Sequence, residues 1–161
     1  MKIKVGFGFD VHQLKNEHPF FMGGVHLEAD KGAFGHSDAD VLLHAICDAL
    51  LGAANLRDIG FHFKNTDERW KGISSLILLK NCVQLITDKG YTIGNIDAMV
   101  CLEAPKLNPH IPQMQINIAQ AAGISEDDVS IKATTNEMMG FIGRQEGVVA
   151  YAVCLLQKTV E

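Results

Sequence analysis

Residues 148–156 constrain the fold most strongly, because this stretch is almost wholly apolar on both faces. A strand with apolar side chains on both faces has to be covered on both faces, by helices or by another subunit. Two more strands are expected upstream, where apolar residues alternate over residues 95–103 and 129–133. The chain therefore requires a central sheet with covering layers, which is typical of an α/β fold.

Helical periodicity and turn residues place the other elements. Helices are expected from Ser37 to about Ala54, from Gly72 to Lys89 and from Pro112 to Gly123. The pattern also predicts a strand over residues 3–8 that ends in a glycine-rich turn, a hairpin over residues 20–27 and a loop over residues 28–35. We predict a single domain over residues 1–161, of α/β (α+β) class, with a mainly four-stranded mixed sheet and helices on one face.

Composition excludes several classes of function. The net charge of −5 argues against a bulk electrostatic nucleic-acid binder, so no nucleic-acid partner is expected. We find no apolar run long enough to span a membrane and no signal-peptide pattern at the N-terminus, so we expect a cytoplasmic protein without a membrane partner. The four cysteines, Cys47, Cys82, Cys101 and Cys154, lie in apolar segments without a CxxC pair, which indicates buried free thiols.

The first predicted helix has an unusual polar side. Asp40, His44 and Asp48 are four residues apart, opposite an apolar arc of Leu42, Ala45, Ile46, Ala49, Leu50 and Ala53. Asp10 and His12 stand two apart, so on an extended chain both point to the same face. Together, Asp10, His12 and His44 offer three ligands and leave a fourth position open, as in catalytic zinc sites, and zinc or manganese suits them. The alternative is a solvated polar face with an incidental histidine.

Several other residues suit anionic or hydroxylated ligands. His36 and Ser37 stand at a helix start, where free N–H groups favour phosphate, although Ser37 also suits a plain helix cap. Thr134 and Thr135 follow a strand and suit phosphate, and Glu137 suits a hard cation such as Mg²⁺, but Thr135 also suits a cap.

The segment from Asn55 to Trp70 is expected to be mostly irregular, and loops of this length in compact domains are commonly functional. Within it, Asp58 to Gly60 suits the binding of a diol or forms a simple turn. Arg144 suits an anion or an ion pair with Glu146, and Lys106 has the same ambiguity.

Taken together, these segments resemble the 2-C-methyl-D-erythritol 2,4-cyclodiphosphate synthase family over essentially the whole chain. The similar segments are residues 8–12, 36–40 with His44, 48–53, 58–60, 104–106 with 109–111, 132–135 and 140–144. The resemblance implies a homotrimer whose sheets face a central core, with each active site shared between neighbouring subunits.

The resemblance also implies a reaction. The substrate is 4-diphosphocytidyl-2-C-methyl-D-erythritol 2-phosphate, and its 2-phosphate attacks the β-phosphorus to give 2-C-methyl-D-erythritol 2,4-cyclodiphosphate and CMP. One Zn²⁺ per chain is implied at Asp10, His12 and His44, and a second ion, Mg²⁺ or Mn²⁺, bridges substrate phosphates near Glu137. His36 and Thr135 are implied to be catalytic.

The implied substrate-binding residues fall into a few short stretches. They are Asp10, His12, His36 and Ser37; Asp58, Ile59 and Gly60, which hold the erythritol; Phe63, Lys64, Asn65, Thr66 and Asp67, whose loop closes over it; Leu102, Glu103, Ala104, Pro105, Lys106, Leu107 and Asn108, which form the cytidine pocket; and Thr134, Thr135, Asn136, Glu137, Phe141 and Arg144.

The chain departs from the usual family pattern at a few positions, none of which is an expected metal ligand. They are Ala39, Lys64, Asn65, Asn136 and Tyr151. Many members place a glutamate at the position of Tyr151, beside Phe9 and Arg144 on the trimer axis, where the family can hold an isoprenoid diphosphate.

Two other functions are compatible with the same residues. A zinc-dependent phosphoesterase would use the same ligands but would release inorganic phosphate. A non-catalytic trimeric nucleotide-binding module would use the metal only for structure, and the predicted set of three ligands rather than four disfavours this alternative.

Overall fold

The computed structural model describes residues 1–158, so residues 159–161 of the predicted domain lie outside the described part. Its five-stranded sheet has the strand order β4-β1-β7-β5-β6. The strands are β1 (Lys2–Asn16), β4 (Lys31–Phe34), β5 (Thr92–Cys101), β6 (Val129–Thr134) and β7 (Gly147–Lys158). All neighbouring pairs are antiparallel except β5 and β6, which are parallel. The predicted mixed sheet is confirmed, but it has five strands rather than four.

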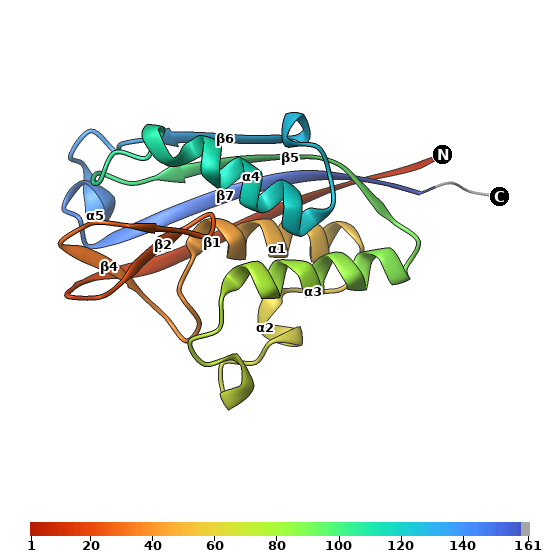
Figure 1. Cartoon of the computed structure of the whole chain (residues 1–161), viewed down its shortest axis with the longest axis horizontal. Coiled ribbons are helices and arrows are strands. Elements are labelled where there is room, and N and C mark those ends of the chain that lie inside the picture. The colour runs from red at the N-terminus through yellow and green to blue at the C-terminus, as the bar shows by residue number, and fades with distance from the viewer. Residues whose placement is uncertain (159–161) are drawn as a thin grey trace.

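The helices form a layer on this sheet, and β2 (Phe20–Met22) pairs with β3 (Val25–Leu27) in a separate hairpin. The longer helices are α1 (Val41–Ala53), α3 (Ser75–Asp88) and α4 (Ile111–Ala122), and the short ones are α2 (Ile59–His62), α5 (Gly140–Gly143) and the 3₁₀ turns η1 (Glu68–Trp70), η2 (Asn108–His110) and η3 (Glu126–Asp128). Helix α1 lies along β1 and β7, and α3 packs on α1 and α4 (Figure 1). These positions confirm the predicted hairpin and the predicted longer helices.

Strand β1 is longer than predicted, and this explains the extra strand of the sheet. The predicted turn after residue 8 is wrong, because β1 continues to Asn16. The predicted loop over residues 28–35 is also wrong in part: β4 pairs with the end of β1, with Asn16 opposite Lys31 and Gln13 opposite Phe34. Local sequence did not reveal this pairing, because it depends on contacts between segments that are distant in the chain.

Gly6 and Gly8 allow α1 to rest directly on β1. A Cβ atom at Gly6 would lie 1.9 Å from the carbonyl oxygen of Ala49, and one at Gly8 would lie 1.9 Å from that of Ala45. These glycines therefore serve the close approach of a helix rather than a turn. Asp10 and His12 follow on the same face of the strand, which carries them to the start of α1.

Asp40 is buried and acts as a structural anchor, so the alternative of a solvated polar face does not hold at this residue. It is the N-cap of α1, and its side chain accepts a hydrogen bond from the Leu43 amide at 3.1 Å. Its carboxylate also accepts from the amides of Gly23 at 3.0 Å and Gly24 at 2.8 Å, which ties the β2–β3 hairpin to the helix. The helix begins at Val41 rather than Ser37 because Asp40 supplies this cap.

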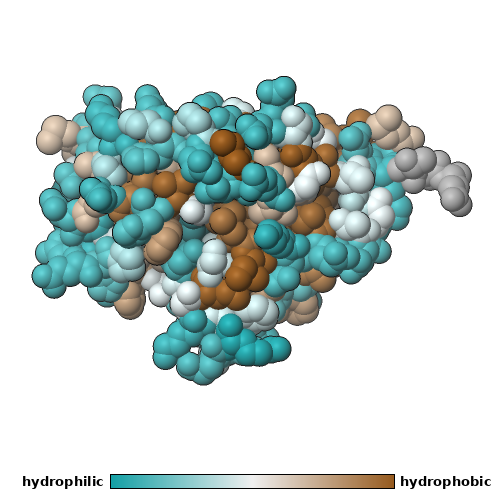
Figure 2. Space-filling view, in the orientation of Figure 1, coloured by the Kyte–Doolittle hydropathy of each residue, from teal (hydrophilic) through white to brown (hydrophobic). Residues whose placement is uncertain are grey.

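One face of the sheet exposes apolar side chains in the single chain. On the opposite side, where the helices lie, Figure 2 shows hydrophilic groups around hydrophobic patches near the centre, and a hydrophilic projection where η1 lies. On the sheet, alternate side chains point away from α1 and are exposed: Ile3, Val5, Phe7, Phe9 and Val11 of β1, and Tyr151 and Val153 of β7. The second face of β7 is therefore uncovered at Tyr151 and Val153 in the single chain.

Two expectations from composition concern the cysteines and the membrane. Cys47, Cys82 and Cys154 are buried free thiols, as predicted, whereas Cys101 is free but only half-buried. Within residues 1–158, no helix is both long and apolar enough to cross a membrane.

Replacing Gly8 by Ala tests the contact between α1 and β1. We expect the free energy of unfolding to fall by about 2 kcal/mol or more, because the new methyl group meets helix backbone that has little room to move. Gly52→Ala is the matched control, since no atom of the described residues lies within 4 Å of its added Cβ and the change favours helix. Urea unfolding is measured for both variants and for wild type. A midpoint for Gly8→Ala equal to that of wild type would contradict the proposed tight contact.

Candidate functional site

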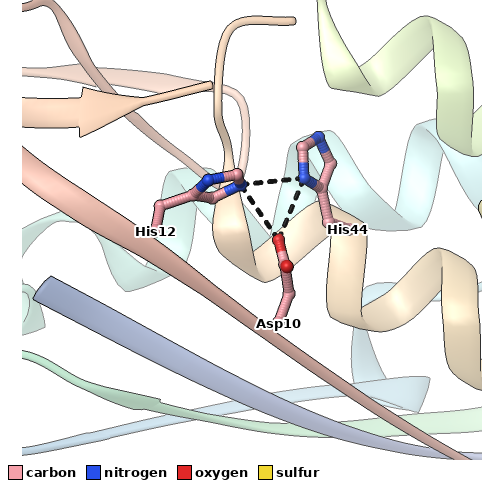
Figure 3. Close-up of side chains that lie close together, drawn as sticks. All are labelled: Asp10, His12 and His44. Carbon is pink, nitrogen blue, oxygen red and sulfur yellow. Dashed lines mark hydrogen bonds and ion pairs between the residues drawn. The ribbon is translucent and has the colours of Figure 1, made fainter. Parts of the chain in front are cut away.

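Asp10, His12 and His44 converge on one point between β1 and the start of α1 (Figure 3). Oδ2 of Asp10 lies 3.0 Å from Nε2 of His12 and 3.0 Å from Nδ1 of His44, and the two nitrogens are 3.1 Å apart. Ligands at about 2.0–2.1 Å from a tetrahedral zinc ion are about 3.3 Å from one another, so these atoms match one face of such a site. Among residues 1–158, this is the one cluster of three or more side chains suited to a metal.

The electrostatics of the cluster also suit a cation. Burial opposes ionisation of Asp10, but hydrogen bonds from His12 and His44 outweigh it and lower the pKa of the carboxyl. Burial likewise opposes protonation of His44, but the Asp10 carboxylate outweighs it and raises the pKa of the imidazole. A metal ion held here would take the place of the proton between His44 and Asp10, because a histidine binds metal through a neutral nitrogen.

The other ring nitrogen of His44 points away from Asp10 and His12 (Figure 3). This nitrogen, Nε2, lies 3.0 Å from Oγ of Ser37 and 2.9 Å from Oγ of Ser75. Ser75 is not among the site residues predicted from the sequence. Nothing in the local pattern marks it as a neighbour of His44, because the two residues are 31 positions apart.

A cavity of about 520 Å³ adjoins the triad. Its lining includes the predicted residues His12, His36, Ser37, Ile59, Gly60, Phe63, Lys64, Asn65 and Thr66, together with His44 and with Gly35, Trp70 and Leu78, which the sequence analysis did not single out. The rings of Phe63 and Trp70 meet edge to face at 5.1 Å and belong to the apolar part of this lining. Trp70 lies in the long segment that was expected to be functional, but no pattern distinguished it there.

The long segment is folded back by hydrogen bonds and is not wholly irregular. Asp58 caps α2 by accepting from the Phe61 amide at 2.9 Å, as in the turn alternative, and Asp48 of α1 accepts from the Ile59 amide at 2.7 Å. Nε2 of His36 lies 3.2 Å from the carbonyl oxygen of Asp67. Asp58 and Asp67 therefore support the cavity wall, and neither is part of the lining.

A second, smaller pocket of about 100 Å³ lies at the ends of β5 and β6. It is lined by Leu102, Glu103, Pro105, Lys106, Leu107, Asn108, Ala133, Thr134 and Thr135, so the predicted cytidine loop and the threonine pair do meet, while Ala104 lies outside the lining. The Glu103 carboxylate accepts from the amides of Asn136 at 3.1 Å and Met138 at 3.2 Å. These bonds fix the turn that carries Glu137, whose carboxylate accepts from the Thr135 hydroxyl at 3.3 Å.

The structure does not bring all predicted site residues together within one chain. The two pockets share no lining residue, so the triad and Thr135 belong to separate sites in the single chain. Phe141 and Arg144 line neither pocket. Arg144 instead pairs with Glu146, with Nε 2.9 Å from Oε1, which is the second of its two predicted alternatives.

The raised pKa of His44 predicts a pH dependence for the metal-free protein. Protonated His44 beside ionised Asp10 stabilises the fold fully below the ordinary histidine pKa of about 6.5, and this contribution is lost as the pH rises through the higher pKa of the folded state. Chelator-treated wild type and His44→Gln are compared by urea unfolding between about pH 6 and pH 9. The difference between their free energies of unfolding is expected to shrink with rising pH. A difference that stays constant would contradict the stabilising pair of protonated His44 and ionised Asp10.

Comparison with known proteins identifies the family of this chain. The model of the YgbB family matches residues 3–157. A relative from Cytophaga hutchinsonii, named 2-C-methyl-D-erythritol 2,4-cyclodiphosphate synthase, is 63% identical over 98% of this chain and 99% of its own length.

Solved structures of related proteins have the same fold as this chain. The CDP complex of IspF from Plasmodium falciparum has a TM-score of 0.86 and 32% identity, covering 98% of this chain and 97% of that chain. The bifunctional IspDF from Campylobacter jejuni has a TM-score of 0.94 and 39% identity over 98% of this chain, which spans 43% of that longer protein. This chain therefore belongs to the YgbB family, whose members among its relatives are lyases named 2-C-methyl-D-erythritol 2,4-cyclodiphosphate synthase.

Proposed function

We propose that this chain converts 4-diphosphocytidyl-2-C-methyl-D-erythritol 2-phosphate to 2-C-methyl-D-erythritol 2,4-cyclodiphosphate and CMP. The observation that carries the proposal is the triad of Asp10, His12 and His44 beside a cavity lined by His36 and Ser37, in a member of this family. An oxygen of the 2-phosphate bonds to the β-phosphorus, the bond from that phosphorus to the oxygen of CMP breaks, and the electron pair leaves with CMP. Water takes no part.

Asp10, His12 and His44 would hold one zinc ion, since two imidazoles and a carboxylate are ligands that zinc favours. Bound there, the ion would supply Lewis-acid stabilisation of the charge on a phosphate oxygen. The carboxylate of Glu137, next to Thr135 of the smaller pocket, would hold a Mg²⁺ or Mn²⁺ ion, which would supply positive charge to stabilise the substrate phosphates.

The chain's own side chains mainly position the substrate. The nucleophile is already a phosphate oxygen, so no strong base is required, and the gain comes from holding the two phosphates against each other. His36 and Ser37 line the cavity beside the triad and would donate hydrogen bonds to phosphate oxygens. Ile59 and Gly60, with Asp58 behind them, would hold the erythritol, while the loop from Phe63 to Asp67 covers it.

The smaller pocket would take the cytidine. Its lining comes from residues 102–108 and from Ala133, Thr134 and Thr135, and Thr135 would contact the diphosphate. The solved CDP complex of the Plasmodium falciparum relative, at 32% identity over nearly the whole chain, supports a cytidine nucleotide as the ligand.

We also propose that the exposed apolar face of β1 and β7 is buried in a homotrimer. Val5 is 68% exposed and Phe7 is 64% exposed in the single chain, and large apolar patches mark interaction surfaces. The Tyr151 ring lies 5.4 Å from that of Phe9 on this face, so Tyr151 contributes to the apolar patch instead of the usual acid. A three-fold arrangement would bring the triad of one subunit to the cytidine pocket of its neighbour.

A product assay separates this function from the two alternatives. The cytidine substrate is expected to yield CMP without inorganic phosphate, and His44→Ala is expected to abolish this activity by removing a metal ligand. Release of inorganic phosphate would instead identify a phosphoesterase, and the absence of any product would favour a binding module. The readout is chromatographic quantification of CMP with a phosphate assay on the same sample.

Mixing two inactive variants tests the shared site. His44→Ala damages the triad and Thr135→Ala damages the cytidine pocket, which lie apart within one chain. If the variants are unfolded together in equal amounts and refolded, about a quarter of sites in random trimers combine an intact triad with an intact pocket. Activity no higher than the mean of the separate variants, in trimers verified by light scattering, would rule out sites shared between subunits.

A further inference from the structure

Ser75 is a fully buried polar residue at the start of α3, and it connects two parts of the site. Its hydroxyl donates a hydrogen bond to Oδ1 of Asp38, and its backbone amide donates to Oδ2 of the same carboxylate at 2.8 Å. On its other side, Oγ of Ser75 lies 2.9 Å from Nε2 of His44. Asp38, Ser75 and His44 therefore form a continuous chain of hydrogen bonds that ends at a ligand of the candidate metal.

The direction of each bond follows from counting protons. The Asp38 carboxylate meets the Ser75 amide, the Ser75 hydroxyl and, at 3.2 Å, the Asp40 amide, so it acts purely as an acceptor. The hydroxyl of Ser75 has a single proton, and that proton goes to Asp38. Its oxygen is consequently left to accept a hydrogen bond from Nε2–H of His44.

We propose that Asp38 and Ser75 are positioning residues, which hold the Nε2 proton of His44 and thereby turn the Nδ1 lone pair toward the metal. The inference rests on the proposed metal centre. A metal-bound imidazole has only its other nitrogen free to donate, and a partner for that N–H fixes the orientation of the ring. We call the hydrogen-bonded chain of Asp38, Ser75 and His44 the relay. Because Ser75 belongs to α3, the helix that packs on α1 also orients His44, the candidate metal ligand that α1 carries.

The second serine near His44 has a different role. Oγ of Ser37 lies 3.0 Å from Nε2 of His44 and accepts a hydrogen bond from the Ala39 amide at 3.3 Å. Unlike Ser75, it donates to no carboxylate among residues 1–158, and it lines the cavity. Its hydroxyl proton is thus free for a substrate oxygen, so Ser75 serves the metal and Ser37 serves the substrate.

Four variants separate these roles. Ser75→Ala removes the acceptor for His44. Asp38→Asn keeps the size of the side chain, but the amide oxygen of the new residue has to face the fixed Ser75 N–H. Its NH₂ group then points at the Ser75 hydroxyl oxygen. The hydroxyl proton of Ser75 is consequently turned toward His44. Ser74→Ala is the matched control, since Ser74 precedes Ser75 at the same helix start, is exposed and makes no side-chain cap. Ser37→Ala tests the serine assigned to substrate.

The zinc dissociation constant is measured for each full-length protein by competition with a chromogenic chelator. In the zinc-loaded proteins, proton exchange of the His44 Nε2–H is followed by ¹H–¹⁵N spectroscopy. Ser75→Ala and Asp38→Asn are expected to weaken zinc binding by roughly 10–100-fold. Both should also speed the exchange of the Nε2 proton, whereas Ser74→Ala should match wild type in both measurements and Ser37→Ala should retain its zinc affinity.

The possible results distinguish a failure of the proposed relay from a failure of the proposed reaction. Wild-type zinc affinity and slow Nε2–H exchange in both Ser75→Ala and Asp38→Asn would overturn the relay, whatever the product assay shows. If Ser75→Ala and Asp38→Asn weaken zinc binding as expected while the wild-type protein forms no CMP, the relay is supported and the proposed reaction is overturned. A wild-type chain that binds no zinc would overturn both.

Discussion

The contact between the backbone of α1 and the bare face of β1 is the constraint on which the rest of the structure depends. Gly6 and Gly8 remove the side chains that would separate the two elements, and the Ala49 and Ala45 carbonyls occupy that space. The same strand face continues into Asp10 and His12, so the close approach that packs the core also sets the distance to His44. A wider spacing between helix and strand would separate the three ligand atoms, because each sits on a rigid element.

Carboxylates near the start of α1 link segments that are distant from one another in the sequence. Asp40 caps its own helix and holds the amides of Gly23 and Gly24, while Asp38 accepts from the first amide of α3. Ser74, the formal N-cap of α3, makes no side-chain cap, so Asp38 caps that helix from a distant part of the chain. Capping of α1 and docking of the hairpin therefore depend on Asp40, and capping of α3 depends on Asp38.

The single chain divides its candidate binding groups between two separate pockets and leaves an apolar face of β1 and β7 uncovered. The cavity beside the triad and the pocket near Thr135 share no residue, and the exposed side chains of β1 and β7 lie on the sheet face that points away from α1. Burial of that face in a symmetric assembly would account for both observations. It would remove apolar surface from water and bring complementary half-sites together.

Sequence by itself determined the elements that depend on local periodicity, and the kinds of ligand available. Alternation placed β5 and β6, and the ligand types of Asp10, His12 and His44 indicated a metal site before any distance was known. Resemblance to a family extended this to the candidate substrate residues. Only the tertiary structure decided the pairing of β4 with β1, the burial of Asp40, and the approach of Ser75 to His44. These features come from contacts between distant segments, whose geometry is set by the packing of the whole core and leaves no period or spacing in the local sequence.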